Sequence, residues 1–141
     1  MTRRLPLLML VLVTALVSVP VADASEKAVV AAVQSTLKPI QRASTNISRC
    51  LKVKDVPRCV RKAGPALAAA ARNADRRVGA AIDGTERRCF ATGIAGYRRG
   101  LRRMAVGGDL MAKGQFRAGA KALQGAGAIM QKASRTIARC G

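Results

Sequence analysis

The chain has 141 residues and a net charge of +19, because 26 lysines and arginines face only 7 aspartates and glutamates. Its length suits one domain with a modest core, and a charge this large on a small domain attracts polyanions. The chain contains no histidine, which removes the usual general base and the commonest metal ligand. We therefore expect a protein that is not an enzyme and holds no metal or other cofactor.

Residues 1–24 have the layout of a secretory signal peptide. Two arginines precede an apolar run from Leu5 to Val19, and the small residues Ala22 and Ala24 stand where a signal peptidase reads the chain. The run is shorter than the roughly 20 residues of a spanning helix, so a cleaved signal is favoured over a retained anchor. We expect residues 25–141, with a net charge of +18 after two arginines and one aspartate are lost, to be secreted or located in the periplasm or cell envelope.

The four cysteines, Cys50, Cys59, Cys89 and Cys140, all lie in the part predicted to be exported. An even number of cysteines in an oxidising compartment indicates a disulfide framework. A zinc site is the alternative, but the chain has no C-x-x-C spacing and no histidine, and zinc sites are built from such ligands. Two disulfides are therefore expected.

Apolar residues recur at steps of three and four in the first half of this domain, which predicts two amphipathic helices. The first stripe runs from Val30 to Leu51, and Pro39 should kink or split that helix. The second runs from Val60 to Val78 behind Asp55, a candidate N-cap. Pro65 is a second expected kink.

The second half carries two further apolar stripes. The third runs from Phe90 to Met104, and Thr85 is its candidate N-cap. We expect the adjacent glycines at 107 and 108 to break the chain, after which Asp109 caps a fourth helix. That helix contains several glycines, each costing about 1 kcal/mol relative to alanine, so it is the one most prone to split or fray.

Four helices with short connections predict an all-α, up-down four-helix bundle with kinked helices. Cys50 ends the first helix and Cys59 begins the second, whereas Cys89 and Cys140 lie at the other end of the bundle. A helix of about 20 residues is about 30 Å long, while bonded cysteines need Cα atoms within about 7 Å. The sequence therefore predicts the pairs Cys50–Cys59 and Cys89–Cys140.

Basic residues occupy the outer face of every predicted helix, and arginine outnumbers lysine. The guanidinium fork suits phosphate or carboxylate groups. The densest cations lie on the third helix and the start of the fourth, and Lys132, Arg135 and Arg139 continue the outer face further on. The candidate anion-binding residues are Arg87, Arg88, Arg98, Arg99, Arg102, Arg103, Lys113, Arg117 and Lys121.

These patterns favour a cationic protein that binds an anionic polymer or surface electrostatically: a cell-envelope polymer, a phospholipid headgroup or a nucleic-acid backbone. Scarce aromatic residues disfavour base stacking and single-strand recognition. Two alternatives stay open, a membrane-active antimicrobial or toxin-like protein and an envelope structural or small-ligand carrier protein. A compositional bias toward arginine, without any function, is the simplest alternative explanation of the charge.

Tyr97 could ligate haem iron, but its place between Ile94 and Leu101 favours core packing.

Overall fold

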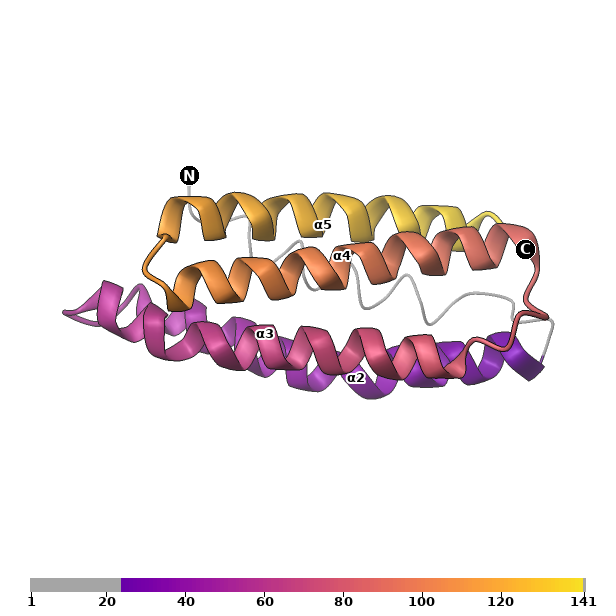
Figure 1. Ribbon diagram of the computed structural model, residues 1–141, viewed down its shortest axis with the longest axis horizontal. Helices are drawn as coiled ribbons and strands as arrows, with labels where there is room; N and C mark the ends of the chain where they lie inside the picture. Colours follow the sequence, from indigo (N-terminus) through magenta and orange to yellow (C-terminus); the bar gives the residue numbers. More distant parts are fainter. Residues whose placement is uncertain (1–23, 141) are drawn as a thin grey trace.

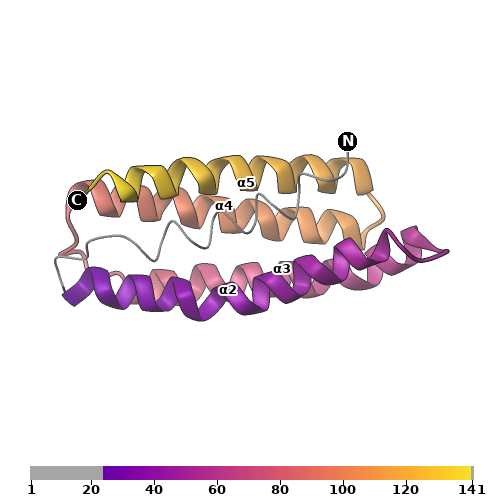
Figure 2. The ribbon, with the colours of Figure 1, turned by 180° about the vertical axis from the view of Figure 1, so that it is seen from behind.

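The computed structural model describes residues 24–140, and this part of the chain is helical without strands. Its four helices, with the labels of Figure 1, are α2 (Ala24–Cys50), α3 (Val56–Ala81), α4 (Arg88–Ala112) and α5 (Phe116–Ala138). Each helix packs against the next in an up-and-down arrangement, which confirms the all-α bundle. Figure 2 shows α2 and α5 from behind. The predicted signal peptide lies outside the described residues except for Ala24.

The helices form where apolar stripes can be buried together. The predicted stripe of α4 is buried over its whole length, from Phe90 to Met104. Small side chains of the two neighbouring helices pack against this stripe: Ala71 of α3 and Ala126 of α5 belong to the same core cluster. The core is therefore filled by a few large side chains of α4 and by close backbone approach elsewhere.

Local structure accounts for the start of α3, and both α2 and α3 accommodate an internal proline. Asp55 caps α3, since its carboxylate accepts a 3.0 Å hydrogen bond from the backbone N–H of Arg58. Both α2 and α3 continue as single helices through Pro39 and Pro65. Each proline removes one backbone donor from its helix, and burial of the apolar face on either side keeps the helix intact.

The predicted break at Gly107 and Gly108 is wrong, because α4 runs through both glycines to Ala112. A Cβ on Gly108 would lie 2.7 Å from the carbonyl oxygen of Gly64 in α3, and a Cβ on Gly64 would lie 2.6 Å from that of Gly108. The missing side chains thus let two backbones touch, and this packing outweighs the low helix propensity of glycine. The chain turns instead at Gly114, whose φ of 79° suits glycine.

The predicted caps around α4 are also wrong. The helix begins at Arg88 and not behind Thr85. Thr85 donates its backbone N–H to Asp83 at 2.9 Å, and Glu86 accepts hydrogen bonds from two N–H groups of the same loop, so the carboxylates close the loop before the helix starts. Asp109 lies inside the last turns of α4 and pairs with Arg72 of α3.

Two disulfides close the ends of the bundle, in the predicted pairing. Cys50 and Cys59 have Cα atoms 5.4 Å apart, and those of Cys89 and Cys140 are 5.8 Å apart. The first joins the end of α2 to the start of α3, and the second joins the start of α4 to the end of α5. Each hairpin of helices is therefore covalently closed at one end.

Gly108→Ala should lower the free energy of unfolding by about 2 kcal/mol, because the new methyl group must separate α3 from α4. Gly127→Ala is the matched control: a Cβ there meets nothing within 4 Å, so this change should stabilise α5 by up to about 1 kcal/mol. Urea unfolding followed by circular dichroism measures both. Equal effects of the two substitutions would contradict the close α3–α4 crossing.

Candidate anion-binding surface

Every carboxylate of residues 24–140 is engaged in the structure. Asp55 caps α3, and Asp83 and Glu86 bond within the loop that precedes α4. The other three form ion pairs: Glu26, Asp75 and Asp109. The four arginines in those pairs are Arg72, Arg87, Arg98 and Arg102. The remaining lysines and arginines of this part have no carboxylate within ion-pair distance.

Arg87 is held by the buried carboxylate of Glu26. Two parallel hydrogen bonds of 2.9 Å join its Nε and Nη2 to the two carboxylate oxygens, and its Nη1 donates to the carbonyl of Cys140 at 2.7 Å. The Glu26 side chain is inaccessible to solvent, so this bidentate pair ties the start of α2 to the start of α4 and the end of α5. Arg87, a predicted anion-binding residue, therefore has a structural partner already.

Asp75 of α3 binds two more of the predicted residues. Its carboxylate accepts hydrogen bonds from Arg98 at 2.7 Å and from Arg102 at 3.0 Å. The Arg98 side chain is only 26% exposed, whereas that of Arg102 is 62% exposed. Arg98 also lies against Gly79, where a Cβ would come within 2.6 Å of its Nη2. Arg98 thus fixes the seam between α3 and α4, while Arg102 keeps much of its surface open to solvent.

The other six predicted residues are exposed and lack a carboxylate partner within residues 24–140. They are Arg88, Arg99, Arg103, Lys113, Arg117 and Lys121. Arg99, Arg103 and Lys121 come together, with Arg102, around a hollow of about 480 Å³ between α4 and α5. Its other lining is apolar: Val106, Leu110, Ala118, Ala122 and Ile129. The structure thus gathers four of the nine candidates, and the sequence did not show that an apolar floor lies between them.

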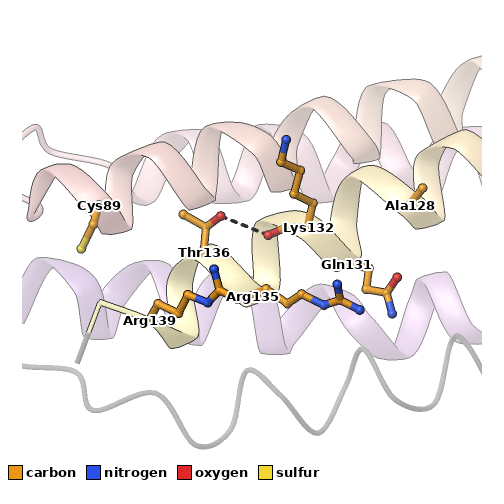
Figure 3. Close-up of a pocket in the computed structure, with 7 residues that line it drawn as sticks. All are labelled: Cys89, Ala128, Gln131, Lys132, Arg135, Thr136 and Arg139. Atoms are coloured by element: carbon orange, nitrogen blue, oxygen red, sulfur yellow. Dashed lines mark hydrogen bonds between the residues drawn. The ribbon is translucent and has the colours of Figure 1, made fainter.

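A second hollow, of about 570 Å³, lies beside the far end of α5 (Figure 3). Lys132, Arg135 and Arg139 line it, and Cys89 is contributed by α4. The hydroxyl of Thr136 donates to the carbonyl of Lys132 at 3.1 Å and is not free for a ligand. Figure 3 shows Lys132 extending away from Arg135 and Arg139, so these cations do not converge on one point. The sequence predicted that these three cations lie on the outer face of the helix, but they were not among the nine candidate anion-binding residues.

Tyr97 is a core residue in the structure. Its side chain is inaccessible to solvent between Ile94 and Leu101, and burial raises the pKa of its hydroxyl. The hydroxyl oxygen has no hydrogen-bond partner among the described residues. The same part of the chain holds no group of three acidic or cysteine side chains placed to bind a metal ion.

Comparisons with models of protein families, with curated proteins and with solved structures found no match to this chain. Across residues 24–140, none of the helices combines the length and apolarity that crossing a bilayer requires.

Tyr97→Phe should leave the free energy of unfolding unchanged or raise it by about 1 kcal/mol at pH 7, because it removes a buried hydroxyl without a partner. The gain should grow above about pH 10. There the hydroxyl of the unfolded wild type ionises while the buried one stays neutral, so wild-type stability falls by up to about 1.4 kcal/mol per pH unit relative to the variant. Urea unfolding of both proteins from pH 7 to 11 measures this, and a constant difference would contradict the buried position.

Proposed function

We propose that the predicted exported domain, residues 25–141, binds an anionic polymer or surface through the outward cations of α4 and α5, without catalysis and without a cofactor. The observation that carries this proposal is the complete use of the carboxylates by the fold. No carboxylate belongs to α5 at all, and the single one of α4, Asp109, faces Arg72. The cations on the outer face of this helix pair therefore require external counterions.

Binding of this kind is driven by phosphate or carboxylate contacts and by the release of small ions. Arginine is well suited to it because its planar fork can hold two oxygens at once. Aromatic residues do not contribute a stacking surface, since Phe90 and Tyr97 are buried and Phe116 is half-buried. We therefore infer recognition of a charged surface or backbone and not of bases or of a defined sequence.

The two disulfides favour the expected export of the domain. Both disulfides close hairpins of the bundle, and such bonds persist in oxidising compartments. We infer that the protein is secreted or retained in the periplasm or cell envelope, where anionic polymers and phospholipid headgroups are exposed. A lytic, toxin-like activity is less well supported, because it would require the core residues of the four helices to enter lipid, and these are exposed only if the bundle opens.

Removing four outward cations of α4 and α5 should weaken binding to a duplex of about 20 base pairs, used as a polyanion of known charge density. The variant combines Arg99→Gln, Arg103→Gln, Arg117→Gln and Lys121→Gln. The slope of log K against log salt should become less steep by about three to four, roughly one unit for each lost phosphate contact. Fluorescence anisotropy between 50 and 200 mM salt measures this slope, because a protein with about six to ten phosphate contacts loses about 10³- to 10⁵-fold in affinity over that range.

The matched control removes the same charge from the exposed face of α2, by changing Lys27, Lys38, Arg42 and Arg49 to Gln. We expect its slope to change by about one at most. Equal losses in both variants would show that total charge, and not the α4–α5 face, governs binding. Absence of wild-type binding at 50 mM salt would refute the proposed function itself.

A further inference from the structure

We propose that the hollow between α4 and α5 docks onto an anionic phospholipid bilayer, with its cations on the lipid phosphates and its apolar floor against the upper acyl chains. This inference rests on the proposed function and names the target of that same surface. The hollow arises from the pattern of side-chain size on two antiparallel helices. On α4 one face carries Arg99, Arg103, Val106 and Leu110, which are spaced by four, three and four residues.

The facing stripe of α5 consists mainly of small residues, at 118, 122 and 125, and ends in Ile129. Large side chains of α4 therefore line one side of the hollow, and the smaller residues of α5 line the other side. Gly125 shows how close the two helices come, since a Cβ there would lie 2.7 Å from the Nε of Arg103. The Arg103 side chain thus lies over Gly125 of α5, in space that a larger residue would occupy.

Three aliphatic side chains in this hollow are left outside both core clusters: Val106, Leu110 and Ile129. Val106 is 52% exposed, and the other two are half-buried. Exposed apolar groups gathered in one place mark an interaction site more often than scattered ones do. A bilayer would remove these three side chains from water without disturbing the packing of the bundle.

The cations around the floor select the kind of surface. Arg99, Arg103 and Lys121 have no carboxylate partner in the described part of the chain, and Arg102 shares Asp75 with Arg98. Cations beside an apolar floor complement a phosphate that lies directly above acyl chains. A nucleic acid or an acidic polysaccharide would use the cations alone. The combination therefore favours an anionic phospholipid over a purely polar polymer.

Two other places were candidates for the same role. The hollow at the far end of α5 is lined by cations that diverge (Figure 3) and by the polar side chains of Gln131 and Thr136. The loop between α2 and α3 exposes Leu51 and Val53, by 64% and 45%, next to the exposed Lys52 and Lys54. This loop serves as the rival docking element in the experiment.

The experiment measures co-sedimentation of the oxidised protein with vesicles of about 30% phosphatidylglycerol in phosphatidylcholine, at about 0.15 M salt, where surface charges are screened beyond about 8 Å. We expect wild type to bind these vesicles and not vesicles of pure phosphatidylcholine. Changing Val106, Leu110 and Ile129 to Asn should weaken vesicle binding about tenfold while binding to duplex DNA stays unchanged. The single change Val106→Asn, at a position half open to solvent, should weaken it about threefold and leaves the fold intact.

The matched control changes Leu51 and Val53 to Asn, and it should bind vesicles as wild type does. Circular dichroism of every variant confirms equal helix content. Undiminished vesicle binding by Val106→Asn and by the triple variant would overturn the inference, even if polyanion binding stands. Loss of binding in the Leu51 and Val53 variant alone would also overturn it, by assigning docking to the α2–α3 loop. Binding of wild type to DNA but not to anionic vesicles would leave the proposed function in place and refute the lipid target.

Discussion

A shortage of carboxylates is the constraint on which this structure depends. Residues 25–141 contain 24 lysines and arginines but only six aspartates and glutamates, and all six are placed at helix starts, in a loop or at seams between helices. The pair of Glu26 and Arg87 links the start of α2 to the start of α4 and the end of α5, and Asp75 joins α3 to α4. None is left to neutralise the outer surface. The repulsion between the unpaired cations of this surface must therefore be offset by interactions other than ion pairs.

Close backbone packing and two covalent closures supply that resistance. Gly64 and Gly108 bring α3 and α4 into contact, and the missing Cβ of Gly100 is replaced by the side chain of Met130 from α5. The core contains few large side chains. The close approach of the helices therefore supplies the dispersion contacts that large side chains would make between helices further apart. The disulfides add a constraint on the unfolded chain that does not weaken with charge. Small residues of α5, Ala118 and Ala122, likewise line the hollow beside α4.

Features of the structure that depend on local periodicity and helix length could be predicted from the sequence. Features that depend on contacts between residues far apart in the chain could not. The buried stripe from Phe90 to Met104, the cap at Asp55 and the disulfide pairing follow from spacing alone. The break at Gly107 and Gly108 was wrong because propensity is a local quantity, while the packing of Gly108 on Gly64 joins residues 44 positions apart in the chain. The partner of Arg87 is 61 residues away, so no pattern in the sequence distinguishes this arginine from a free surface cation. The apolar floor between the cations likewise appears only once α4 and α5 lie together.

The doubled arginines of α4 show how one helix serves both stability and binding. Arg98 and Arg102 are four residues apart and both reach Asp75 on α3. Arg99 and Arg103 follow them by one position each, which rotates the side chain by about 100° around the helix. They line the hollow beside α5 without a carboxylate partner in residues 24–140, and Arg102 lines that hollow as well. Two parallel stripes with the same spacing thus face two different seams. The first stripe meets a carboxylate and holds α3, whereas the second meets a helix without carboxylates and remains positively charged. The ion pairs of Asp75 thus join α4 to α3, while the unpaired arginines of the neighbouring stripe lie on the side of α5.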